Sequence, residues 1–166
     1  MKLGAISDTH DNLAAIAAAI RRFSEVGVEA IVHAGDFCAP FALKPLLQTR
    51  LPLYAVFGNC DGERAGLTAL LPELAEGPRP FELGGRKVCV GHVWERFPRE
   101  MVHASDILVF GHTHEPKVEH REGRLIVNPG EAGGWLSGRC TIAVIDTDTM
   151  TADVETVYEQ ARTDHA

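Results

Sequence analysis

Short apolar runs alternate with amphipathic stretches through the first half of the chain, and this alternation predicts strands followed by helices. The predicted strands are Lys2–Ser7, Ala30–Ala34 and Leu53–Phe57. The predicted helices are about Asn12–Val26, Pro40–Gln48 and Leu67–Leu74. Asp11 suits the N-cap of the first helix, and Gly27 suits its C-terminal end. This strand–helix rhythm implies a parallel sheet with right-handed crossovers.

The pattern changes after Pro78 and Pro80, where short strands separated by turns predominate. The predicted strands are Phe81–Leu83, Lys87–Val90, Ile107–Phe110, Lys117–His120, Leu125–Val127, Thr141–Asp146 and Asp153–Tyr158, with one helix at about Arg96–Ala104. We expect this half to pair mostly antiparallel, beginning with a hairpin that turns at Gly84-Gly85. Two sheets packed face to face with helices outside would accommodate this many strands. No linker, repeat or low-complexity segment appears, so we expect one α/β domain over residues 1–166.

Composition and charge narrow the function classes. The chain has 166 residues and a net charge of -7, and it carries no basic stripe, which argues against binding nucleic acid through its phosphates. Its cysteines are dispersed, without a C-x-x-C pair, which fits a reducing compartment. No apolar stretch approaches the roughly 18 residues of a membrane span, and the N-terminus reaches an acid by Asp8, unlike a signal peptide. We therefore expect a cytoplasmic protein with no membrane contact.

Metal-competent side chains follow five of the predicted strands at their carboxyl ends. They are Asp8, His10, Asp36, Asn59, His92, His112 and His114. Ligands of open α/β sheets bind beyond the carboxyl ends of the strands. His112 and His114 stand one residue apart, and in an extended segment they would point the same way, which suits metal chelation.

The types of these side chains narrow the metal. Carboxylate and amide oxygens mix with imidazoles, whereas a structural zinc site would be richer in cysteine. Mixed oxygen and nitrogen ligands suit Mn²⁺, with Ni²⁺, Fe²⁺, Co²⁺ and catalytic Zn²⁺ as alternatives. Seven ligands are too many for one ion but suffice for two divalent ions if one carboxylate bridges them. Two metals about 3.5–4 Å apart are a common device for activating water and binding a phosphoryl group.

The motifs in their order resemble the signature of the calcineurin-like metallophosphoesterases, and most of all the small single-domain prokaryotic phosphodiesterases. They are Asp8-Thr9-His10, Gly35-Asp36, Gly58-Asn59-Cys60-Asp61, His92, Gly111-His112-Thr113-His114 and Asn128-Pro129-Gly130-Glu131. The likeness covers about residues 2–148.

The resemblance implies a four-layer α-β-β-α sandwich of two mixed sheets flanked by helices. It also implies a division of the ligands: Asp8, His10 and His114 on one metal, Asn59, His92 and His112 on the other, and Asp36 bridging. A hydroxide bridging the metals would attack phosphorus in line, with Asn59, Asp36 and His10 as the catalytic residues. The implied activity is hydrolysis of a small phosphodiester.

Two alternatives to a phosphodiesterase stay open. The same chemistry serves phosphomonoesterases acting on nucleotides or small phosphorylated metabolites. The same fold also serves as a non-catalytic scaffold in the retromer coat, where ligands have been lost, and the complete ligand set here favours an enzyme. The sequence does not decide whether the chain forms a homodimer or a higher homo-oligomer.

Several positions depart from the family pattern or carry a competing interpretation. Cys60 stands where many members have a histidine that helps to protonate the leaving group, and a thiol is a poor acid for that task. Trp94 follows His92 and either packs in the core or shapes substrate access. His33 lies inside a predicted strand and is interpreted as a packed histidine, and Asp61 either orients a histidine or caps a loop.

Overall fold

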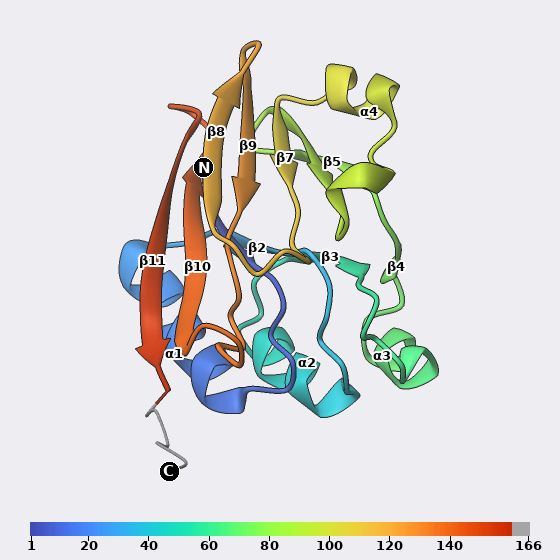
Figure 1. Cartoon of the computed structure of the whole chain (residues 1–166), viewed down its shortest axis with the longest axis vertical. Helices are drawn as coiled ribbons and strands as arrows, with labels where there is room; N and C mark the ends of the chain where they lie inside the picture. Colours follow the sequence, from blue (N-terminus) through green and yellow to red (C-terminus); the bar gives the residue numbers. More distant parts are fainter. Residues whose placement is uncertain (161–166) are drawn as a thin grey trace.

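Two mixed β-sheets form the centre of the structure, which is a computed structural model that describes residues 1–160 (Figure 1). Residues 161–166, the end of the predicted domain, lie outside the described part. The first sheet has the strand order β11-β10-β1-β2-β3-β4. Its strands are β1 (Lys2–Ile6), β2 (Ala30–His33), β3 (Leu53–Phe57), β4 (Ala75–Glu76), β10 (Arg139–Asp146) and β11 (Thr151–Glu159). Strands β1, β2 and β3 run parallel, as predicted, the unpredicted β4 pairs in parallel with β3, and β10 and β11 add an antiparallel pair at the other edge.

The second sheet has the strand order β5-β6-β7-β9-β8. Its strands are β5 (Arg79–Leu83), β6 (Arg86–Val90), β7 (Ile107–Val109), β8 (Lys117–Arg121) and β9 (Arg124–Asn128). The hairpins β5–β6 and β8–β9 are antiparallel. The centre of the sheet differs from the expectation, because β6, β7 and β9 pair in parallel.

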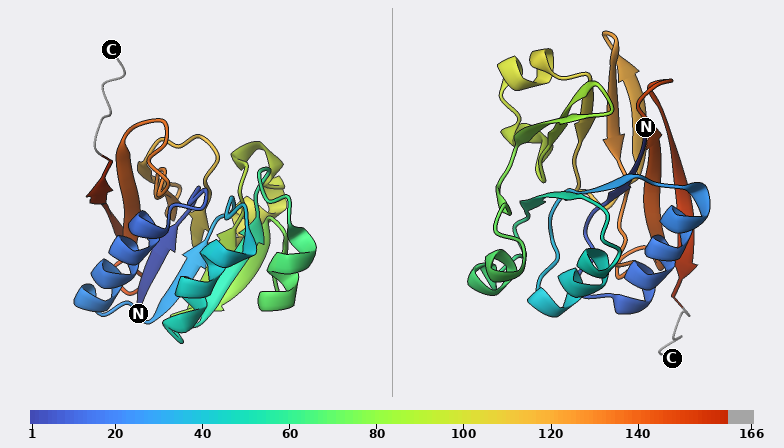
Figure 2. Two further views of the ribbon diagram at one scale, coloured as in Figure 1. Left: turned by 90° about the horizontal axis from the view of Figure 1, so that it is seen from below. Right: turned by 180° about the vertical axis from the view of Figure 1, so that it is seen from behind.

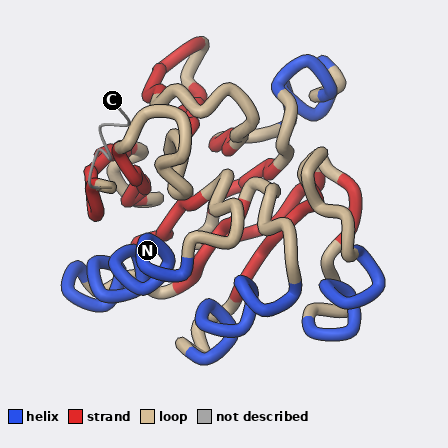
Figure 3. Tube along the Cα trace, turned by 60° about the horizontal axis from the view of Figure 1, so that its bottom comes forward, coloured by secondary structure: helices blue, strands red, loops and turns tan. Residues whose placement is uncertain are grey.

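Helices cover the outer faces of both sheets. They are α1 (Leu13–Val26), α2 (Pro40–Gln48) and α3 (Arg64–Leu70), then the 3₁₀ turn η1 (Trp94–Arg96) and α4 (Arg99–Ala104). Figure 2 shows α1, α2 and α3 side by side along the first sheet, and Figure 3 shows α4 apart from them on the other side of the molecule. The four-layer α-β-β-α arrangement is therefore confirmed.

Three apolar clusters hold these layers together. One lies between the sheets, where Val32 of β2 and Ile145 of β10 pack with Val90 and Val109 of the second sheet. Another joins the first three helices to the first sheet through residues such as Phe23, and a smaller one lies under η1 and α4. The central strands β6, β7 and β9 are buried at consecutive residues, as strands covered on both faces are, so their short apolar runs were readable in the sequence.

Local chemistry sets the helix ends. Asn12, and not Asp11, caps α1, since its side chain accepts a hydrogen bond from the Ala15 N–H at 3.1 Å. Gly27 ends the helix in the left-handed conformation, as predicted. Helix α3 lies a few residues before its predicted range, because Pro72 disfavours helical geometry at Leu71, where the chain turns extended. No helix within residues 1–160 is long and apolar enough to cross a membrane.

Candidate metal centre

The carboxyl ends of β1, β2, β3, β6 and β7 meet at one place, and the side chains that follow them form a group that we call the strand-end cluster. Its members are Asp8, His10, Asp36, Asn59, His92, His112 and His114. The backbone there departs from the extended geometry expected at Gly111–His114. Left-handed φ values occur at Asp8 (53°), His10 (40°), Asp36 (61°), His112 (70°) and His114 (61°). Such values are costly for residues other than glycine and gather at functional sites.

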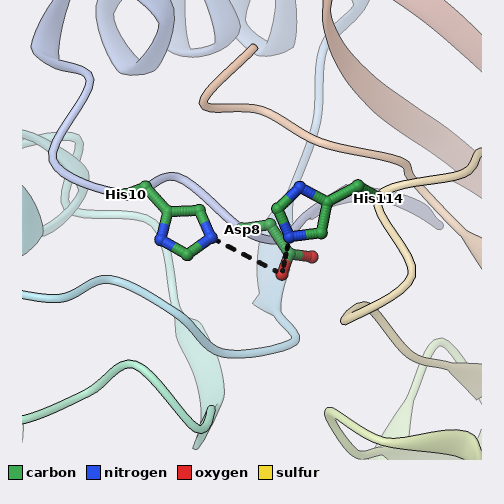
Figure 4. Close-up of side chains that lie close together, drawn as sticks. All are labelled: Asp8, His10 and His114. Carbon is green, nitrogen blue, oxygen red and sulfur yellow. Dashed lines mark ion pairs between the residues drawn. The ribbon is translucent and has the colours of Figure 1, made fainter. Parts of the chain in front are cut away.

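One part of the strand-end cluster is built around Asp8, which is fully buried. Its Oδ1 lies 3.5 Å from Nε2 of His114 and 3.9 Å from Nε2 of His10 (Figure 4). Ligand-capable atoms of all three residues lie within 4.8 Å of one another. His10 Nε2 also lies 3.6 Å from Oδ2 of Asp36.

The other part is built around Asn59. Its Oδ1 lies 2.8 Å from Nε2 of His92 and 2.8 Å from Nδ1 of His112. His92 Nε2 in turn lies 3.4 Å from Oδ2 of Asp36. The same oxygen of Asp36 therefore faces a histidine of each part. His112 and His114 face different parts, although they are one residue apart.

Several polar atoms of the strand-end cluster are buried and have no hydrogen-bond partner among residues 1–160. They include Asp8 Oδ1 and His10 Nε2. His92 donates its Nδ1–H to the carbonyl of Ala34 at 2.7 Å, so Nε2 is the ring nitrogen that faces Asn59 and Asp36. Adjacent ligands of an octahedral ion with bonds of about 2.1 Å lie about 3 Å apart, close to these separations. The cluster therefore fits divalent cations, held by oxygen and imidazole donors.

The two carboxyl groups differ in their electrostatic surroundings. Burial raises the pKa of Asp8 above its ordinary value. Burial would do the same at Asp36, but the hydrogen bond and charge of His92 and the Cys60 N–H outweigh it and lower the pKa of Asp36 to about 2. Asp36 also raises the pKa of His92 against the effect of burial. Each partner thus favours the charged form of the other.

Asp61 and Asn128 hold the loops that carry the strand-end cluster. The buried carboxylate of Asp61 accepts the N–H groups of Asp36 (3.1 Å), Cys38 (2.8 Å) and Gly58 (2.7 Å). Asp61 therefore caps loops, as one of its two interpretations proposed. Asn128 donates from Nδ2 to the carbonyl of Gly111 at 3.1 Å and to Oγ1 of Thr113 at 3.0 Å, and so fixes the turn between the two histidines.

Glu131 is a residue of the site that stands in the Asn128-Pro129-Gly130-Glu131 motif, but the motif alone did not indicate its role. It is 1% exposed, and its Oε1 lies 3.2 Å from Nδ1 of His114. Backbone N–H groups of Leu136 and Ser137, followed by His114, lower the pKa of Glu131 despite its burial. A buried carboxylate on Nδ1 leaves Nε2 of the histidine free to bind a metal. Glu131 follows strand β9 closely. The search for polar residues at the carboxyl ends of strands, which identified the other residues, could therefore have found it.

Three other predictions concern residues around the cluster. Cys60 is exposed as a residue, but partial desolvation of its thiol and the nearby Asp36 carboxylate raise its pKa to about 11. Trp94 packs against Phe97 and Phe110, at ring separations of 5.4 and 5.2 Å, as a core indole would. His33 is fully buried, and burial lowers its pKa to about 3, so it is the packed neutral histidine that was predicted.

Comparisons with known proteins agree on one family. The model of the calcineurin-like phosphoesterase superfamily domain matches residues 1–150. Phosphodiesterase MJ0936 of Methanocaldococcus jannaschii is 36% identical over 156 residues, which cover 89% of this chain and 94% of the relative. Phosphodiesterase YfcE of Escherichia coli K12 is 27% identical over 165 residues, 90% of each protein. A solved structure described as a novel archaeal phosphodiesterase superposes with a TM-score of 0.82 at 31% identity, over 94% of this chain and 99% of that one.

Proposed function

The chain belongs to the calcineurin-like phosphoesterase superfamily, and on this basis we propose that it is a metal-dependent phosphodiesterase. The family match confirms the resemblance that the order of the sequence motifs indicated. Relatives named as phosphodiesterases match almost the full length of the chain, which supports the same reaction class here.

The observation that carries the proposal is the position of Asp36 Oδ2. It lies 3.6 Å from His10 Nε2 and 3.4 Å from His92 Nε2, between the two parts of the strand-end cluster. We infer that this carboxylate bridges two cations. Asp8, His10 and His114 would complete the ligands of one cation, and Asn59, His92 and His112 those of the other. We propose Mn²⁺ first, with Ni²⁺, Fe²⁺, Co²⁺ and Zn²⁺ as alternatives, because these metals accept mixed oxygen and nitrogen ligands.

The two cations, when bound, would supply an activated water and positive charge opposite the phosphoryl oxygens. The protein supplies the positions. Ala34 fixes the ring orientation of His92 by accepting a hydrogen bond from its Nδ1, and the Glu131 carboxylate, 3.2 Å from Nδ1 of His114, would orient that ring in the same way. Asn59 has an amide N–H₂ that donates to the weak acceptor sulfur of Cys60 at 3.3 Å, and we infer that this group turns to a phosphoryl oxygen of the substrate. The hydrolysis then proceeds by in-line attack of water on phosphorus.

A diester suits the strand-end cluster better than a monoester does. The seven side chains of the cluster are two carboxylates, one amide and four imidazoles, so none of these seven is a lysine or arginine that would neutralise a second charge on the substrate. The neutral thiol of Cys60 is also a weak acid for protonating a poor leaving group. Both features support substrates that carry one negative charge and a good leaving group.

Rates with Mn²⁺ on bis(p-nitrophenyl) phosphate and on p-nitrophenyl phosphate test the proposal. A kcat/KM that is at least tenfold higher on the diester supports a phosphodiesterase. A higher value on the monoester would instead support the phosphomonoesterase alternative. Protein that binds no metal and hydrolyses neither compound would support the scaffold. We also infer a cytoplasmic location, which the free thiols of Cys38, Cys60, Cys89 and Cys140 support.

A further inference from the structure

An exposed tryptophan and leucine stand beside the strand-end cluster on a loop between β9 and β10. Trp135 is 59% exposed and Leu136 is 78% exposed. We call residues 133–138 the Trp135 loop. Exposed large apolar side chains are common singly, but two in succession next to a polar centre need a reason.

The Trp135 loop is held in place by hydrogen bonds to the strand-end cluster itself. The indole Nε1–H of Trp135 donates to the carbonyl of His10 at 3.0 Å. The N–H of Gly133 donates to the carbonyl of Asp8 at 2.7 Å, and the N–H of Leu136 donates to Oε1 of Glu131 at 3.0 Å. Glu131 in turn contacts His114. The loop is therefore tied to all three residues of one part of the cluster.

Further bonds hold the loop from its other side. The carbonyl of Gly133 accepts the side-chain N–H groups of Asn12 and Gln160, both at 2.7 Å. Within the loop, the N–H of Gly138 donates to the carbonyl of Gly134 at 3.0 Å. The indole is thus fixed at its polar edge while most of its surface remains open to solvent. A rigid aromatic face of this kind loses little conformational entropy when it binds a ligand.

We propose that Trp135 and Leu136 form the subsite for the ester group that stays on phosphorus, and that this group is a nucleoside or another flat aromatic group. In an in-line displacement the leaving group lies opposite the attacking water, whereas the retained ester group lies sideways in the equatorial plane. A sideways group would meet the rim of the cluster, where the Trp135 loop stands. Bases stack on exposed aromatic side chains without regard to sequence, which suits an uncharged apolar wall. This inference rests on the proposed function.

Substrates that share one leaving group but differ in the retained ester group measure how much the retained group contributes to kcat/KM. We would compare thymidine 5′-(p-nitrophenyl phosphate) with methyl p-nitrophenyl phosphate, using Mn²⁺-loaded protein. The expected result is that Trp135→Ala lowers the ratio of kcat/KM for the thymidine ester over the methyl ester about tenfold, mainly through KM. Trp135→Phe should keep most of the ratio. Trp94→Phe, a change in the packed cluster under η1, should keep it within twofold and serves as the control.

A binding measurement tests the subsite without catalysis. Trp94 and Trp135 are the only tryptophans, so Trp94→Phe leaves Trp135 as the sole indole and Trp135→Phe leaves Trp94. Thymidine 5′-monophosphate should quench the fluorescence of the first variant and not of the second, and inorganic phosphate should quench neither. This measurement separates the subsite from the phosphodiesterase activity. A protein that shows the quenching but hydrolyses no diester would contradict the proposed function and leave the subsite supported. An unchanged substrate ratio in an active Trp135→Ala variant, or no quenching of Trp135, would overturn the subsite.

Discussion

Glu131 Oε1 lies 3.2 Å from Nδ1 of His114, and the same carboxylate accepts the backbone N–H groups of Leu136 and Ser137. One buried residue therefore joins a proposed metal ligand to the Trp135 loop. The orientation of the His114 ring and the position of the loop depend on each other through this contact. Partners of this kind are often as important for metal affinity as the ligands are.

Replacing Glu131 with glutamine should weaken one metal site. The variant keeps the shape of the side chain but loses the charge that orients His114, so we expect Mn²⁺ affinity to fall about 10–100-fold. Titration calorimetry of metal-free protein measures the affinity. Glu119→Gln is the matched control, since Glu119 pairs with Lys117 and Arg121 on β8. Equal affinity in both variants would contradict the role given to Glu131.

His112→Ala and His114→Ala should each affect a different cation. His114 faces Asp8, whereas His112 faces Asn59, so each variant leaves the ligands of the other cation complete. We expect elemental analysis after dialysis to find about one Mn²⁺ per chain in each variant and about two in the wild type. Activity should fall at least a hundredfold in both, as expected when a metal that activates water is lost. Full metal content together with full activity in both variants would refute the assignment.

Cys60→His should change the dependence of the rate on the leaving group. The thiol of Cys60, with a pKa of about 11, donates a proton poorly near neutral pH, whereas an imidazole donates readily. We expect alkyl esters to gain at least about tenfold in kcat/KM, a part of the roughly 10²–10⁴-fold that well-placed general acid catalysis contributes, and p-nitrophenyl esters to gain less. A series of diesters whose leaving groups differ in pKa gives the measurement. If kcat/KM depended on the pKa of the leaving group equally in the wild type and the variant, protonation of the leaving group would not be limited by Cys60.

His33 should make the protein less stable in mild acid. Burial lowers its pKa from 6.5 to about 3 in the folded state, so between these values the unfolded chain binds a proton that the folded chain does not. Stability therefore falls as the pH falls through this window, by about 1.4 kcal/mol per unit, or about 2 kcal/mol from pH 6.5 to 5. Urea unfolding with EDTA at pH 7 and pH 5 checks this. His33→Gln should lose about 2 kcal/mol less than the wild type over that range, and an equal loss would assign the pH dependence to other groups.

Most of the fold was readable from local patterns. Strand β3 has the predicted bounds, and the hairpin of β5 and β6 turns at Gly84-Gly85 as expected, because short apolar runs and turn residues are local features of the sequence. Strand β4 has only two residues and no pattern of its own, so it was missed. The parallel pairing of β6, β7 and β9 was also missed, because the choice of pairing partner depends on packing between segments far apart in the chain.

The strand-end cluster was predictable for a similar reason. A buried strand with a histidine or aspartate at its carboxyl end is a local signal, and the topology alone brings several such ends together. Glu131 was recognised only as part of a motif, because its approach to His114 depends on how the segment after β9 folds. No sequence pattern indicated a role for Trp135, because only the folded loop shows that its indole donates a hydrogen bond to the carbonyl of His10.

The central claim is that two cations share Asp36 and support hydrolysis of a phosphodiester. The most direct measurement titrates metal-free protein with Mn²⁺ and follows bound metal and bis(p-nitrophenyl) phosphate hydrolysis in the same samples. We predict that the metal-free protein is inactive and that activity reaches its plateau near two bound Mn²⁺ per chain. Full activity in EDTA, or a plateau at one ion with no further binding, would contradict the claim.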